Sequence, residues 1–306
     1  MKRFENNLFF ADGDTEVGVA LRRAMALADS NRARLTVVDV IEPVGSPKQV
    51  STHLGRDLSD LLRERRLETL VGLVKPFEQL IYTEVFSGVP FVEVIRAVRR
   101  SGYDLVAKSA RPPAGFSDRL FGSTDMHLLR KCPCPVWIDR PAATDSYANI
   151  LAAVDPLAPT GEGCDRLVMD LATSLAKTEE AALTVVHAWR LGGESMLRHG
   201  RFRLPENELN DLLRSTESTH RDQLGALLGS YDMGPEDPGV HLIRDEAAPA
   251  IRRIAEALPA DLIVMGTVGR TGVPGFFIGN TAEEVLQTTM ASVLAVKPAG
   301  FVSPVQ

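Results

Sequence analysis

Short apolar runs alternate with segments of helical periodicity along the whole chain. The run at 8–12 ends on Asp12, and apolar side chains then recur every three or four residues, at Val17, Leu21, Ala24 and Ala28. Four more short apolar runs follow, at 35–40, 80–86, 104–107 and 135–138. Strands that alternate with helices predict parallel strands joined by right-handed crossovers, which is an α/β fold.

The same pattern begins again near residue 150. The run Ile150 to Asp155 again ends on an aspartate, and Leu183-Thr-Val-Val186 repeats Leu35-Thr-Val-Val38 without a change. Further strands are expected at 241–244, 261–265 and 292–296. We therefore predict two tandem, doubly wound domains, 1–141 and 146–306, each with a five-stranded parallel sheet. The fifth strand of each copy lies near a sheet edge, where it could pair with the other copy or in a homodimer.

A glycine-rich segment follows the strand expected at 261–265. It contains Gly266, Gly269, Gly272, Gly275 and Gly279. Asn280 is a favourable N-cap, and Glu283 lies at the spacing of a capping box, so a helix is expected to start near Thr281. A glycine loop that leads into a helix N-terminus offers backbone N–H groups to an anion such as phosphate. A turn without a ligand is the alternative.

Composition and charge narrow the function classes. The 306 residues are 44% hydrophobic and 24% charged, as in a soluble globular protein, and the net charge of -6 disfavours a nucleic-acid partner. No apolar run is long enough to cross a bilayer, so we expect a cytoplasmic protein without a membrane partner. The three cysteines are too few for a disulfide framework, and we expect no protein-bound metal site.

The glycine segment carries a resemblance to a known family. Gly266, Gly269, Gly279 and Asn280 match Gly-x2-Gly-x9-Gly followed by Ser, Thr or Asn, the pattern of nucleotide-binding members of the universal stress protein family. The tandem arrangement and the segment Leu-Leu-Arg-Lys-Cys-Pro-Cys-Pro-Val-Trp, at 128–137, resemble its UspE type. The resemblance covers nearly the whole chain. It implies a Rossmann-like fold, similar to that of adenine nucleotide α hydrolases, that binds ATP with Mg²⁺.

The resemblance also implies a set of ligand contacts in the second copy. Asp155 and Ala188 would contact the adenosine, although an aspartate before Pro156 also suits a turn. The phosphates would be held by Gly266, Gly269, Gly279, Asn280 and Thr281. Arg270 is either a charge-assisted phosphate contact or a solvated loop residue.

The first copy departs from the pattern. When Gly122 is aligned on Gly279, Ser109 and Pro112 stand where the second copy has Gly266 and Gly269. Because proline has no N–H to offer, we predict that this copy keeps the fold and has lost the nucleotide cradle. Two basic residues near the strand end could still attract an anion, namely Lys108 and Arg111. Asp12 would then be a relic of the adenosine site or serve another ligand.

The sequence favours binding over catalysis. It has no Gly-x4-Gly-Lys-Ser/Thr loop and no Gly-x-Ser-x-Gly elbow. We expect an ATP-binding regulator of a stress response, acting on an unidentified protein partner, with no catalytic residues. Two alternatives stay open: a slow ATP-hydrolysing enzyme, and a binder of a non-nucleotide, lipid-like ligand in a cleft between the copies. The basic cluster Arg198, His199, Arg201 and Arg203 is expected to be a solvated loop.

Overall fold

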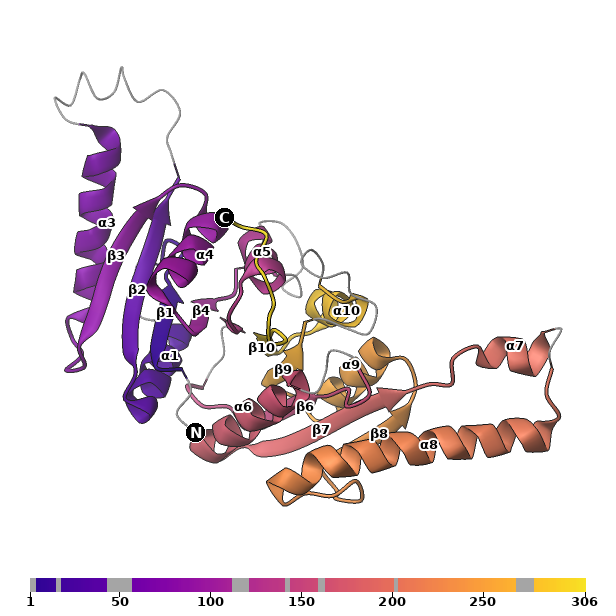
Figure 1. The fold of residues 1–306 in the computed structure, drawn as a ribbon. Coiled ribbons are helices and arrows are strands. Elements are labelled where there is room, and N and C mark those ends of the chain that lie inside the picture. The colour runs from indigo at the N-terminus through magenta and orange to yellow at the C-terminus, as the bar shows by residue number, and fades with distance from the viewer. Residues whose placement is uncertain are drawn as a thin grey trace. The chain divides into compact units, whose positions relative to one another are not determined.

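The computed structural model describes residues 4–14, 18–42, 57–111, 121–140, 144–158, 163–200, 203–267 and 278–306. The chain divides into two compact units (Figure 1). Unit 1 contains Met1–Ser146, Val273–Ile278 and Ser292–Gln306, and unit 2 contains Tyr147–Gly272 and Gly279–Ala291. Each unit is an α/β body, as predicted.

Unit 1 is built on five parallel strands in the order β3-β2-β1-β4-β5. The strands are β1 (Asn6–Phe10), β2 (Arg34–Ile41), β3 (Ile81–Ser87), β4 (Leu105–Ser109) and β5 (Val136–Asp139). The helices are α1 (Val19–Asn31), α3 (Leu58–Val74), α4 (Pro90–Ser101) and α5 (Ser123–Lys131). The central strands β1 and β4 are buried almost throughout, which explains their continuous apolar runs.

A sixth strand of unit 1 comes from the second sequence copy. β10 (Ser292–Val296) pairs antiparallel with β5, so the sheet is mixed and mostly parallel. Ser292 fixes the pairing, because its Oγ donates to Asp139 Oδ1 (2.9 Å) and accepts from Arg140 N (3.0 Å). The expectation that the fifth strands could pair with each other is confirmed.

Unit 2 has four parallel strands in the order β8-β7-β6-β9, which corresponds to β3-β2-β1-β4 in unit 1. These strands are β6 (Asn149–Ala153), β7 (Ala182–Trp189), β8 (Val240–Arg244) and β9 (Leu262–Gly266). The helices are α6 (Cys164–Glu179), α7 (Glu194–His199), α8 (Glu206–Leu228), α9 (Ala247–Ala257) and α10 (Asn280–Thr288), with a 3₁₀ turn at Gly229–Tyr231. The predicted domains 1–141 and 146–306 describe the sequence copies and remain a prediction; the compact units differ from them because β10 packs in unit 1.

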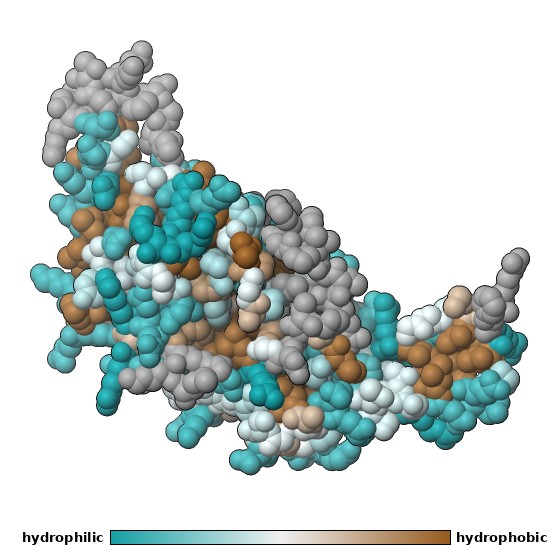
Figure 2. Space-filling view, in the orientation of Figure 1, coloured by the Kyte–Doolittle hydropathy of each residue, from teal (hydrophilic) through white to brown (hydrophobic). Residues whose placement is uncertain are grey.

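The basic cluster after β7 is partly helical. Arg198 and His199 end α7, so the expectation of a loop is wrong for them, and Arg201 lies outside the described residues. Glu194, at the start of α7, pairs with Arg198 (2.7 Å) and Arg244 (2.5 Å). An apolar cluster joins this helix to α8, and part of it is visible as brown surface in Figure 2: Trp189, Leu209 and Leu213 with Leu191, Leu197, Leu204 and Leu242.

None of the helices within the described part of the chain is both long enough and apolar enough to cross a bilayer.

Candidate functional site

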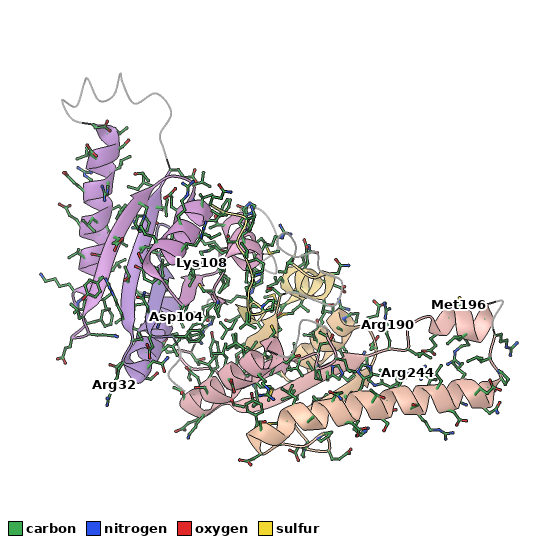
Figure 3. The ribbon with its side chains drawn as sticks, in the orientation of Figure 1. Arg32, Asp104, Lys108, Arg190, Met196 and Arg244 are labelled. Carbon is green, nitrogen blue, oxygen red and sulfur yellow. The ribbon has the colours of Figure 1, made fainter. Side chains whose placement is uncertain are left out.

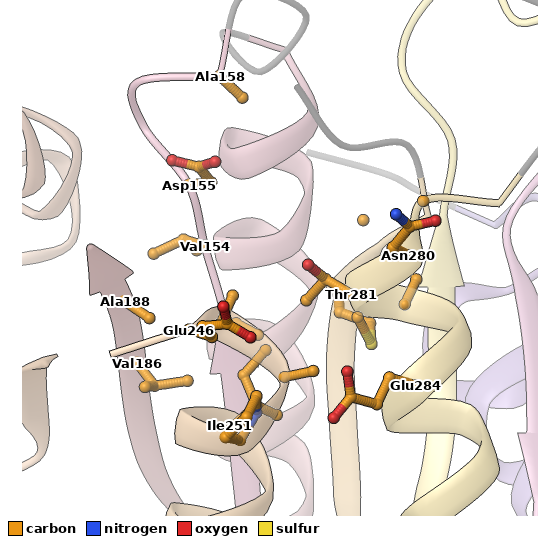
Figure 4. Close-up of a pocket in the computed structure, with 18 of the residues that line it drawn as sticks. Val154, Asp155, Ala158, Val186, Ala188, Glu246, Ile251, Asn280, Thr281 and Glu284 are labelled. Carbon is orange, nitrogen blue, oxygen red and sulfur yellow. The ribbon is translucent and has the colours of Figure 1, made fainter. Parts of the chain in front are cut away.

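Unit 2 contains a cavity of about 550 Å³ at the carboxyl ends of β6, β7 and β9 (Figure 4). The carboxyl ends of parallel strands share one sheet edge, so residues far apart in sequence meet there. Six of the eight residues predicted for the nucleotide site line this cavity, namely Asp155, Ala188, Gly266, Gly279, Asn280 and Thr281. The other two, Gly269 and Arg270, lie outside the described residues.

Asp155 is held at the cavity wall by its own backbone. Its N–H donates to Asp165 Oδ1 (3.0 Å), and its carbonyl accepts from Ala158 N (2.9 Å). The bond from Ala158 N closes the turn that the sequence Asp-Pro suggested. The carboxylate of Asp155 nevertheless lies at the cavity wall (Figure 4). The turn and the ligand contact are therefore compatible.

Gly266 has a packing reason to be glycine. A Cβ at this position would lie 2.9 Å from the Sγ of Cys164, closer than atoms of neighbouring side chains approach. The absence of a side chain lets the start of α6 pack against the end of β9. A side chain at this position would therefore have to displace Cys164, whether or not a ligand also approaches it.

The N-terminus of α10 faces the cavity. The helix begins at Asn280, and its N-cap is Gly279, so the prediction of an Asn280 cap with a Glu283 capping box is wrong by one residue. Gly279 N donates to Thr267 O (2.7 Å), and the helical ladder begins with Glu283 N on Gly279 O (2.9 Å). The backbone N–H groups of residues 280–282 come before the first of these helical hydrogen bonds. All three residues line the cavity. Such an end attracts anions.

The rest of the wall is acidic. Its described carboxylates are Asp155, Asp165, Asp245, Glu246 and Glu284. Burial raises the pKa of Asp165 to about 6; the bond from Asp155 N opposes this shift, and the charge of Asp155 adds to it. Among the described residues no group of three or more His, Cys, Asp or Glu side chains could hold a metal ion. Asp165 was not predicted, because nothing in the sequence distinguishes it from other carboxylates that start helices.

The corresponding place in unit 1 is filled by internal ion pairs. Lys108 is fully buried and pairs with Asp12 (3.1 Å) and with Asp125. Asp125 Oδ2 also accepts from the N–H groups of Gly122 (3.1 Å) and Arg111 (3.2 Å), so the N-terminus of α5 already holds a carboxylate.

Unit 2 has no such network, because Met265 and Ala282 stand where unit 1 has Lys108 and Asp125. The guanidinium of Arg111 pairs with Asp14 (2.5 Å). The expectation that the two basic residues of the first copy would attract an anion is therefore not supported. A cavity of unit 1 that is lined in part by Asp14 and Ser109 measures about 10 Å³, room for one water at most. Pro112 lies outside the described residues, and the loss of the nucleotide cradle stays a prediction.

Comparison with known proteins agrees with the fold. The model of the Universal stress protein family matches residues 4–140 and again 146–297. The chain is similar to Universal stress protein E of Escherichia coli K12, with 31% identity over 222 residues that cover 71% of this chain and 68% of that protein. It is 27% identical to Universal stress protein E of Salmonella typhi over 100% of this chain and 98% of that protein.

Solved structures extend the likeness to three dimensions. A universal stress protein from Pseudomonas aeruginosa UCBPP-PA14 superposes with a TM-score of 0.74 at 25% identity, covering 97% of this chain and 94% of that chain. One from Archaeoglobus fulgidus DSM 4304 has a TM-score of 0.57 at 18% identity, covering 96% and 98%, and shows the fold alone.

Proposed function

This chain belongs to the universal stress protein family, in its tandem form, and from that premise we propose that unit 2 binds ATP with Mg²⁺ in the cavity at the end of its sheet. Unit 1 contributes the scaffold. The output is regulatory: a protein partner in the stress response distinguishes the loaded from the empty state.

One observation carries the proposal. The six described residues of the expected nucleotide pattern, which span 155–281 in the sequence, surround a single cavity. Its volume lies within the range of about 300 to 1,000 Å³ usual for small-molecule sites. Asp155 and Ala188, which the resemblance assigns to the adenosine, line this cavity together with the N-terminus of α10 (Figure 4).

The acidic wall favours ATP bound as its magnesium complex. A bare triphosphate would be repelled by Asp155 and Asp165, whereas Mg²⁺ offsets much of its charge. The N–H groups at the start of α10 then supply directional contacts. We infer binding rather than rapid turnover, because the sequence has no Gly-x4-Gly-Lys-Ser/Thr loop and no Gly-x-Ser-x-Gly elbow.

A matched pair of charge variants tests the proposal. Asn280 and Ser123 are both exposed first residues of the equivalent helices α10 and α5. Aspartate is favourable in the first turn of a helix, so neither Asn280→Asp nor Ser123→Asp should harm folding. In calorimetric titration with Mg-ATP, Asn280→Asp should weaken binding about tenfold or more, because its carboxylate faces the phosphates. Ser123→Asp should bind like the wild type. Equal affinities for all three proteins would refute this site.

A further inference from the structure

An ion pair joins two elements at the wall of the cavity in unit 2. Arg190 follows the last residue of β7, and Glu246 is the N-cap of α9. Arg190 Nη1 donates to Glu246 Oε1. Both residues line the cavity; Figure 3 labels Arg190 at the end of its strand, and Figure 4 shows Glu246 in the cavity wall.

This pair can open at little cost. The side chains of Arg190 and Glu246 are 65% and 61% exposed, and ion pairs with this much access to water contribute little to stability. The fold therefore does not depend on keeping these two groups together. A ligand that offers a stronger partner to the guanidinium can take it from the carboxylate.

The charge around the pair shows what such a ligand would be. Arg190 is the only lysine or arginine among the described residues that line the cavity, and the described carboxylates there number five: Asp155, Asp165, Asp245, Glu246 and Glu284. Asp245 has its own partner, Arg253 (2.8 Å), which does not line the cavity. A guanidinium fork matches phosphate oxygens in a bidentate manner, with stronger bonds than neutral donors form.

The first sequence copy has no equivalent of this pair. When Leu183 is aligned on Leu35, Glu42 stands at the position of Arg190. When Pro249 is aligned on Pro90, Ser87 stands at the position of Glu246. The pair therefore occurs in the copy that has a large cavity and is missing from the copy whose cavity is filled.

We propose that Arg190 is a specificity-determining contact for a phosphate-bearing ligand, held by Glu246 when the cavity is empty and transferred to the ligand's phosphate when it is filled. This inference rests on the proposed nucleotide site and adds a contact outside the glycine pattern. Glu246 competes with the ligand for Arg190, so the ion pair sets the affinity of the site and its preference for phosphorylated nucleosides.

A double-mutant cycle with Mg-ATP, followed by calorimetry, tests the competition. Arg190→Gln should weaken binding about tenfold, as expected for a lost charge-assisted contact. Glu246→Gln should tighten binding about threefold, because it frees the guanidinium. That gain should disappear in the double variant, because it acts through Arg190. Adenosine has no phosphate, so its affinity should be unchanged by Arg190→Gln.

The neighbouring ion pair provides the control. Arg253→Gln breaks the less exposed contact with Asp245 but removes no arginine from the cavity wall, so it should change ATP affinity less than twofold. Unchanged ATP binding by Arg190→Gln would overturn the inference and leave the nucleotide site standing. A gain from Glu246→Gln that persists without Arg190 would also overturn it, because the carboxylate would then act by repulsion alone. If the wild type binds no nucleotide, both this inference and the proposed function fail.

Discussion

Replacing Lys108 by methionine should destabilise unit 1 strongly. The ammonium is fully buried among Asp12, Asp125 and the carbonyl of Ser109 (2.8 Å). Methionine is the residue that unit 2 has at the aligned position, Met265, so the side chain fits the site by length. The variant leaves the buried carboxylate of Asp125 without its cation. Breaking a buried ion pair in this way costs about 3 to 5 kcal/mol.

Adding Asp125→Ala to Lys108→Met should recover much of the lost stability of unit 1. Lys108→Met with Asp125→Ala gives unit 1 the two residues of unit 2. No buried charge then lacks a partner, because Asp12 is partly exposed to water. The remaining penalty comes from the N–H groups of Gly122 and Arg111, which lose an acceptor, and amounts to about 1 to 3 kcal/mol. The double variant should therefore be more stable than Lys108→Met alone.

The pH dependence gives an independent check. Burial already raises the pKa of Asp125, and Lys108 opposes this rise. Without Lys108 the folded-state pKa moves further above the unfolded one, so the folded state binds more protons. Stability should then fall as the pH rises above the unfolded pKa of about 4, and the penalty of Lys108→Met should be smaller near pH 5 than at pH 7.

Tryptophan fluorescence can follow unit 1 alone. The chain has two tryptophans, Trp137 in β5 of unit 1 and Trp189 in unit 2, so urea unfolding in a Trp189→Phe background reports the first unit. An additive loss in the double variant, or no loss in Lys108→Met at pH 7, would refute the interpretation of this network as a single buried ion cluster.

Three further predictions concern the described contacts. Gly266→Ala should destabilise unit 2 by about 1 to 3 kcal/mol, because the added Cβ overpacks against Cys164. Adding Cys164→Ala should remove that overpacking and restore stability. Unchanged urea unfolding of Gly266→Ala would contradict the overpacking. Asp165, with its pKa raised to about 6, should make stability fall between pH 4 and pH 6, whereas Asp165→Asn should flatten that fall in thermal melts. Ser292→Ala should destabilise the β5–β10 pairing by about 1 to 2 kcal/mol and speed hydrogen exchange there; unchanged exchange would argue against its anchoring role.

Much of the fold follows from the sequence because the signals are local. The repeated Leu-Thr-Val-Val predicts equivalent strands in the two copies, and these are β2 and β7. The direction of β10 does not follow, because its apolar run is equally suited to a parallel or an antiparallel neighbour. That choice depends on contacts with β5, which lies about 155 residues away in the chain.

The site was predictable where it depends on backbone chemistry. Glycines and a helix start are visible in the sequence, so six residues of the cavity wall were predicted to lie together. The cap of α10 was misplaced by one residue, since Gly279 and Asn280 are both acceptable N-caps. The sequence did not predict the ion pairs of Arg190 with Glu246 or of Lys108 with its carboxylates, because ion pairs between separate elements leave no periodic signal. Their partners become visible only when the strands are assembled.

The most direct test of the central claim is the number of ATP molecules that each chain binds. Freshly purified protein would be denatured to release and identify any bound nucleotide, then refolded empty and titrated with Mg-ATP by calorimetry. One ATP per chain is expected, since unit 2 has the open cavity and the corresponding place in unit 1 holds the ion pairs of Lys108. Two ATP per chain would contradict the assignment of unit 1, and no binding at millimolar ATP would contradict the nucleotide site itself.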